Sequence, residues 1–176
     1  MKKIMEVVKR VLGFVFAFCM LCGFAECVDL GKPVLSEDES FNVKVSSNLN
    51  REEHRRTIKY EYGGKLNSNP YKYISVKNVI SYVNRITKEV LAEFTVVMKF
   101  RYNENTQRAE CLSTSYGSIA KDTDYSVNVS ARKANNTTDQ GAGIADVEFK
   151  YRGERQDAFS RQISCDCFGG ISIFDC

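Results

Sequence analysis

The sequence lacks the residues and motifs on which most recognisable active sites depend. It contains a single histidine, His54, and no tryptophan. A Ser-His-Asp or Cys-His system needs a base that a folded neighbour orients, whereas His54 stands in a charged stretch at residues 51–56 and is expected to be solvated. No phosphate-binding loop, dinucleotide-binding glycine pattern or His-Glu-x-x-His helix occurs. We therefore expect no enzyme activity.

An excess of basic charge is also missing from most of the chain. The full sequence has a formal net charge of +3, but residues 1–25 hold four of its 25 basic residues and one of its 22 acidic residues. The remainder of the chain is therefore neutral. Because nucleic-acid-binding domains usually carry a basic patch or stripe, we expect no nucleic-acid partner.

Long apolar runs are absent except near the start of the chain. Residues 11–25 form an apolar run of 15 residues, preceded by four basic residues. A membrane-spanning helix needs roughly 20 apolar residues. A basic segment, a short apolar run and small residues at its end are instead typical of a secretory signal peptide. We predict a signal peptide over residues 1–25, cleaved after Ala25, and a secreted or cell-surface protein that touches the membrane only through this segment before cleavage.

The cysteines agree with export, because disulfides form in oxidising compartments. Five cysteines follow the signal peptide, so at least one is unpaired or bonded to another chain. Cys111 and Cys165 lie in strand-like segments and are the first candidates for a disulfide, with Cys167 as an alternative partner of Cys111. The single residue between Cys165 and Cys167 does not match the spacing of zinc ligands. We expect neither a metal nor a cofactor.

Residues 26–56 are polar and show no long apolar pattern. Only residues 41–45 alternate between apolar and polar side chains, which is compatible with an isolated or edge strand. We interpret residues 26–56 as a polar leader that precedes the folded domain.

From residue 57 onward, apolar side chains recur at every second position, which predicts half-buried β-strands. Breakers typical of turns separate these stretches. About nine strand candidates follow one another at hairpin spacing, which indicates an antiparallel sandwich or barrel over residues 57–176. Arg161 is an exception to the apolar pattern in the last stretch. The clearest alternating stretches are residues 58–62, 94–102, 125–129, 147–151 and 159–167.

Residues 79–91 fit two interpretations. Their apolar positions match the spacing of an amphipathic helix reasonably well. The segment is also rich in β-branched residues and has a polar stretch at residues 84–89 that suits a hairpin tip. We favour two strands joined by a turn.

Four short motifs between residues 74 and 173 carry a resemblance to known proteins. They are Phe100-Arg-Tyr-Asn103, Cys111-Leu-Ser-Thr-Ser115, the Asn135-Asn136 turn and Cys165-Asp-Cys-Phe-Gly169. In these motifs the chain resembles small exported, largely uncharacterised proteins of Gram-positive anaerobic bacteria. The resemblance implies an immunoglobulin-like β-sandwich that is cross-linked by a disulfide bond between Cys111 and Cys165. It carries over no catalytic residue.

Tyr60, Tyr62, Tyr71 and Tyr73 flank a turn rich in glycine and asparagine. Tyrosine rings at a sheet edge offer amphipathic area for stacking on sugars or protein surfaces. Their shared parity within each strand is also typical of core filling. We predict a binding module whose partner is a protein or glycan at the cell surface, contacted by these tyrosines or by the loop at residues 135–143.

Two alternatives to a binding module remain. Asp122 and Asp124 lie in one expected turn, and two carboxylates placed across a cleft can hydrolyse a glycosidic bond, which would make the protein a hydrolase of envelope polysaccharide. The other alternative is a structural or inhibitory module whose spare cysteine forms a disulfide-linked dimer.

Overall fold

The computed structural model describes residues 32–61 and 71–175. The expected signal peptide at residues 1–25 lies outside these residues, as do Cys27, Tyr62 and Cys176. Within the described residues all regular elements are β-strands, and every paired strand is antiparallel to its neighbour. The expectation of an all-β antiparallel fold is confirmed.

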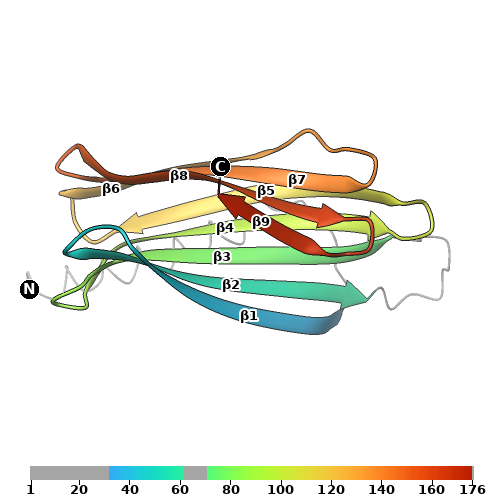
Figure 1. Cartoon of the computed structure of the whole chain (residues 1–176), viewed down its shortest axis with the longest axis horizontal. Helices are drawn as coiled ribbons and strands as arrows, with labels where there is room; N and C mark the ends of the chain where they lie inside the picture. Colours follow the sequence, from blue (N-terminus) through green and yellow to red (C-terminus); the bar gives the residue numbers. More distant parts are fainter. Residues whose placement is uncertain (1–31, 62–70, 176) are drawn as a thin grey trace, which may run out of the picture.

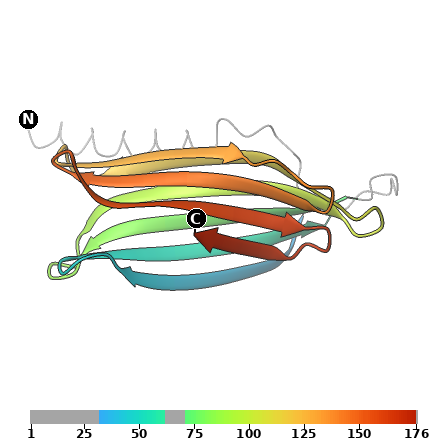
Figure 2. The ribbon, with the colours of Figure 1, turned by 45° about the horizontal axis from the view of Figure 1, so that its top comes forward.

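The strands form two sheets that pack face to face (Figures 1 and 2). Sheet A has the order β1-β2-β3-β4-β5, and sheet B has the order β6-β7-β8-β9. The strands of sheet A are β1 (Lys32–Lys44), β2 (Leu49–Glu61), β3 (Lys72–Asn84), β4 (Val90–Asn103) and β5 (Arg108–Ala120). Those of sheet B are β6 (Tyr125–Lys133), β7 (Gln140–Tyr151), β8 (Glu154–Asp166) and β9 (Ile171–Asp175).

The strand order differs from that of an immunoglobulin domain. Each strand pairs only with strands next to it in the sequence, so both sheets are meanders. Immunoglobulin domains have Greek-key connections, which carry successive strands from one sheet to the other. The immunoglobulin-like topology implied by the resemblance is therefore wrong for the described strands, because the described chain passes from sheet A to sheet B only once, between β5 and β6.

Residues 79–91 form two strands and a turn, as expected. β3 ends at Asn84 and β4 begins at Val90. The side-chain oxygen of Asn84 accepts hydrogen bonds from the backbone N–H groups of Ile86 (2.9 Å) and Thr87 (3.1 Å). The asparagine thus stabilises the turn, while the β-branched residues on either side fill the strands.

The polar leader expected at residues 26–56 is wrong from Lys32 onward. β1 pairs with β2 along its length, and β2 pairs with β3. Arg51 and Glu53 of β2 are buried at 7% and 4% exposure, on the face that β3 fills with Ile80 and Tyr82. Charged residues therefore occupy inward positions of β2, so the alternation of apolar and polar side chains that marks a strand is absent from this part of the sequence. The folded domain begins before residue 57.

Apolar side chains from both sheets fill the space between them. The ring of Phe149 in β7 stacks on that of Tyr82 in β3, with centroids 4.1 Å apart, and lies 6.1 Å from the ring of Tyr125 in β6. Such contacts remove large apolar areas from water, at roughly 25 cal/mol per Å². The core cluster includes Ile74, Val76, Ile80, Tyr82, Phe94, Met98, Phe100, Val147, Phe149 and Ile163.

Five charged side chains, which we call the interior ion network, connect the two sheets. Arg161 of β8 donates to both carboxylate oxygens of Glu53 in β2, and its Nε donates to Asp175 of β9 at 2.7 Å. Arg51 of β2 forms ion pairs with Glu53 at 3.0 Å and with Asp157 of β8 at 3.1 Å. The side chains of Arg161 and Glu53 are 6% and 3% exposed. The apolar pattern is broken at Arg161 because this residue pairs across the sheets.

Two aromatic side chains, Tyr82 and Phe159, contact the interior ion network. The hydroxyl of Tyr82 donates to Asp157 at 2.9 Å. Burial, together with the negative charge of Asp157, raises the pKa of Tyr82. The ring of Phe159 lies 4.1 Å from the guanidinium carbon of Arg51 and 5.1 Å from that of Arg161. These contacts replace part of the hydration that the two guanidinium groups lose on burial.

The expected disulfide between Cys111 and Cys165 is wrong, and so is the alternative with Cys167. All three thiols are buried and unbonded. Cys165 lies in β8 and Cys111 in β5, and Gly141 of β7, the register partner of Cys165, packs against the backbone of Cys111. Burial raises the pKa of Cys111 to about 11 and that of Cys165 to about 12. These are inert core thiols.

Replacing Arg161 with glutamine leaves the carboxylate of Glu53 buried without its main partner. Breaking a buried ion pair in this way costs about 3–5 kcal/mol. We expect Arg161→Gln to lower the free energy of unfolding by about 3 kcal/mol in chemical denaturation. As a control, Arg132→Gln removes the more exposed pair with Asp146 and should change the stability little. Equally small losses in both variants would contradict the buried network.

Asp175 makes the stability depend on pH. Partial burial acts to raise its pKa, but the hydrogen bond from Arg161 and the charges of Arg161 and Arg51 outweigh burial, so the pKa is lowered. Such a carboxylate stabilises the fold above its unfolded-state pKa of about 3.9, and this contribution is lost as the pH falls. We expect thermal stability to fall more steeply below about pH 4 in the wild-type protein than in Asp175→Asn. Parallel pH curves would show that Asp175 contributes nothing.

Candidate functional site

One end of the sandwich gathers the segments that stood out in the sequence. It is the end at which β3, β5, β7 and β9 begin, on the right of Figure 1, and we call it the loop end. The turn at residues 104–107, the β6–β7 loop at residues 134–139 and the turn at residues 167–170 all lie there.

Three of the four predicted tyrosines lie at the loop end, and Tyr62 lies outside the described residues. Tyr60 and Tyr73 are cross-strand partners on the outer face of sheet A, where Tyr73 is only 6% exposed. Tyr71 directly precedes β3, and its ring centroid lies 4.7 Å from the guanidinium carbon of Arg101. Of these three tyrosines, Tyr71 is the one that lines a cleft.

Tyr71 forms one wall of a groove with a volume of about 360 Å³, which we call the loop-end groove. The groove runs between β4 and β5 of sheet A and the β6–β7 loop. It unites the tyrosine-rich segment and the loop at residues 135–143, which were separate candidates in the sequence. Its other lining residues are Arg101, Arg108, Ala109, Glu110, Asn136, Thr137 and Thr138.

A hydrogen bond to the side chain of Asn136 and a close approach of two backbone segments at Gly141 hold the β6–β7 loop against β5. The side-chain oxygen of Asn136 accepts hydrogen bonds from the N–H groups of Cys111 (3.4 Å) and Ala142 (3.1 Å). Gly141 allows this close approach, since a Cβ atom there would lie 2.4 Å from the carbonyl carbon of Glu110. The groove is therefore built on fixed backbone, as a preformed binding surface requires.

Two arginines and one glutamate set the charge of the loop-end groove. Arg101 donates to Oε2 of Glu110 through Nε (2.8 Å) and Nη2 (2.6 Å), so these two charges offset each other. The guanidinium of Arg108 has neither a hydrogen bond nor an ion pair with the described residues. The groove thus offers hydrogen-bonding groups, an aromatic ring and one uncompensated positive charge.

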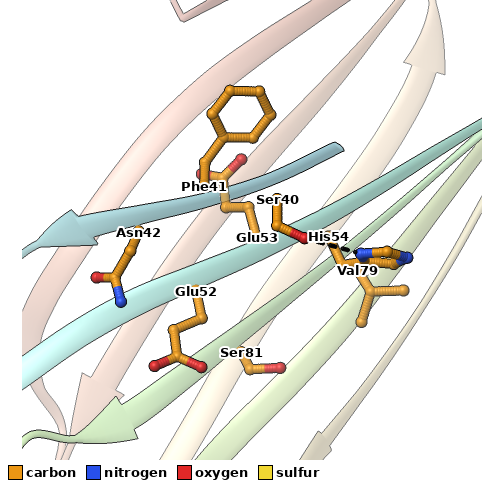
Figure 3. Close-up of a pocket in the computed structure, with 8 residues that line it drawn as sticks. All are labelled: Ser40, Phe41, Asn42, Glu52, Glu53, His54, Val79 and Ser81. Carbon is orange, nitrogen blue, oxygen red and sulfur yellow. Dashed lines mark hydrogen bonds between the residues drawn. The ribbon is translucent and has the colours of Figure 1, made fainter. Parts of the chain in front are cut away.

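An open cleft of about 450 Å³ lies on the outer face of β1, β2 and β3 (Figure 3). Ser40 Oγ and His54 Nδ1 are 3.2 Å apart and hydrogen-bonded. Val79 lies beside the imidazole ring, and Glu52 lies farther along β2. Glu53 also lines this cleft, but its carboxylate belongs to the interior ion network.

The Ser40–His54 pair was missed in the sequence because β1 was interpreted as part of a leader. Only the pairing register of β1 with β2 places Ser40 opposite His54. His54 is exposed, and among the described residues no carboxylate hydrogen-bonds its other ring nitrogen. A serine nucleophile needs a base that such a carboxylate orients. The pair can bind polar groups but lacks the third member of a catalytic triad.

Asp122 and Asp124, the acids predicted for a hydrolase, lie in the turn between β5 and β6 at the other end of the sandwich. A side-chain oxygen of Asp122 accepts the N–H of Asp124 at 2.9 Å, and Asp124 pairs with Arg152 at 3.0 Å. Neither residue lines the two clefts described above. Their contacts stabilise turns.

Residues 32–61 and 71–175 contain no group of three or more His, Cys, Asp or Glu side chains placed to hold a metal ion. Searched over the same ranges, the structure has no helix with the length and apolar character needed to cross a membrane. Comparison of the chain with protein-family models, curated proteins and solved structures finds no match.

Gly141→Ala should push the β6–β7 loop away from β5, because the added methyl group meets backbone atoms of Glu110. Overpacking of this kind costs about 2 kcal/mol of unfolding free energy. We also expect faster hydrogen exchange at the amide of Ala142. Gly153 has nothing within 4 Å of an added Cβ but a φ of 83°, so Gly153→Ala should cost about 1 kcal/mol without affecting that amide. Unchanged exchange in Gly141→Ala would contradict the tight contact.

Proposed function

We propose that the protein is an exported, non-enzymatic binding module that captures a glycan or protein at the cell surface through the loop-end groove. One observation carries the proposal. Tyr71, the charged side chains of Arg101 and Arg108, and the loop at residues 136–138 converge on one preformed groove. Aromatic rings together with a few polar groups on a rigid surface are the usual means of binding polar ligands.

The position of the groove supports this use. Binding residues are commonly carried by loops that a rigid scaffold holds in place. Here the scaffold is the pair of sheets, and the β6–β7 loop is fixed to it by Asn136 and Gly141. A ligand would therefore meet the groove in its bound shape, which reduces the entropy lost on binding.

Export is part of the proposal. It is supported by the basic start and the 15-residue apolar run within residues 1–25, and by the resemblance to small exported proteins of Gram-positive anaerobes. A signal peptide cleaved after Ala25 would release the folded domain on the outer side of the membrane or leave it at the cell surface. Its partner would then be extracellular.

The two alternatives have less support from the geometry. A hydrolase of envelope polysaccharide would need two acids across a cleft, whereas Asp122 and Asp124 share a turn and Asp124 is paired with Arg152. A disulfide-linked dimer would need an accessible thiol, whereas the described cysteines, Cys111, Cys165 and Cys167, are all buried. Such a dimer would have to use a cysteine outside the described residues.

Tyr71→Ala removes the aromatic wall of the loop-end groove. On a glycan array, we expect signals that depend on the groove to weaken at least about tenfold, because buried aromatic contacts dominate such interfaces. Tyr116, which is 51% exposed on β5 and does not line the groove, provides the matched control Tyr116→Ala, which should bind as the wild type does. Thermal unfolding verifies that both variants are folded. Glycan binding that is equally strong in Tyr71→Ala would exclude the groove as the binding site.

A further inference from the structure

The arginines of the described residues differ in whether the side chain has a hydrogen-bond or ion-pair partner. Eight of these ten side chains have a hydrogen-bond or ion-pair partner, and only Arg108 and Arg155 have none. The eight are Arg51, Arg55, Arg56, Arg85, Arg101, Arg132, Arg152 and Arg161. Arginines without a partner are therefore the minority among these ten. The surroundings of Arg108 and of Arg155 can be compared directly.

The two unpaired arginines lie in different settings. Both side chains are exposed, and Arg155 lies near the start of β8, at the end of the sandwich opposite the loop end. Arg108 begins β5 and lines the loop-end groove together with Tyr71, Thr137 and Thr138. Only Arg108 thus combines an unused guanidinium with an aromatic ring and neighbouring hydroxyl groups.

The charge of the groove favours an anionic ligand. Two nitrogens of Arg101 donate to the same carboxylate oxygen of Glu110. The positive charge of Arg101 and the negative charge of Glu110 therefore offset each other. Among the residues that line the groove, one positive charge remains, on Arg108. A guanidinium has a planar fork of donors that matches a carboxylate through two parallel hydrogen bonds, which makes such contacts stronger and more specific than neutral ones.

We infer that the loop-end groove binds an acidic saccharide, with the carboxylate of a uronic acid held by Arg108 and the sugar hydroxyls by residues 136–138. This inference rests on the proposed function and narrows its ligand class. The polar lining suits a saccharide. The side-chain oxygen of Asn136 already accepts two backbone N–H groups, so its amide nitrogen remains to donate. The hydroxyl of Thr137 donates to Asp139 at 2.9 Å and can still accept, and Thr138 contributes a second hydroxyl group. Tyr71 adds a ring face at the edge of the site.

The test compares one oligosaccharide in two charge states. Isothermal titration calorimetry measures the binding of hexagalacturonic acid and of its fully methyl-esterified form to the purified protein. We expect the acid to bind at least about tenfold more tightly than the ester. Added salt should weaken the binding of the acid and leave the binding of the ester unchanged. Arg108→Gln should remove this preference. Arg155→Gln removes the same charge away from the groove and should keep it.

The outcomes separate the inference from the proposed function. If acid and ester bind equally and Tyr71→Ala abolishes both, the groove is a binding site but the carboxylate assignment is wrong. If a sulfated oligosaccharide binds more tightly than the uronic acid, the anion is a sulfate ester and the assignment is also wrong. If neither form binds, the acidic saccharide is excluded, and the glycan array decides on the proposed function. Arg108→Lys, which keeps the charge but loses the fork, should bind the acid with intermediate affinity.

Discussion

The contact between Glu53 and Arg161 is the constraint on which the arrangement of the two sheets depends. Both side chains are buried, and if they moved apart Glu53 would keep only Arg51 as a partner and Arg161 only Asp175. Strand side chains alternate between faces, so a one-residue slip of β2 would turn Glu53 and Arg51 to solvent and bring Glu52 and His54 inside. The ion network thus specifies a single register for β2 and its position under β8.

That register also determines what sheet A presents at the loop end. In the observed pairing, Tyr60 lies opposite Tyr73, Tyr73 opposite Arg101, and Arg101 opposite Glu110. This row crosses four strands on the outer face and ends at the loop-end groove. The charged residues that stabilise the interior and the aromatic and charged residues that form the groove are therefore coupled through the same strand pairings, although the two sets do not touch.

Local signals were enough to predict most of the strands, but not the site. The hairpin at residues 84–89 could be predicted because Asn84 and the β-branched residues around it act over a few positions. Strands were expected at residues 41–45 and 58–62, but the rest of β1 and β2 was missed. The reason is that β2 carries Arg51 and Glu53 where an apolar side chain is expected, and their partners in β8 are more than 100 residues away. The groove depends on the contact of Gly141 with Glu110, a tertiary approach that no spacing in the sequence reveals. The failed disulfide has a similar cause, since strand-like surroundings do not fix the distance between two thiols.

Proximity of reactive residues is weak evidence for catalysis in a sheet of this kind. Antiparallel pairing sets nearly every residue of β1 opposite one of β2, so a serine facing a histidine, as Ser40 faces His54, follows from register alone. A catalytic base must also be held in one orientation by a further hydrogen bond. The loop-end groove differs in that its geometry is fixed by contacts outside the strand ladder, through Asn136 and Gly141. Contacts that shape a surface without being part of the strand ladder are a stronger sign of function than a pair that the ladder brings together. In this protein such contacts occur at the loop-end groove, which favours a binding role.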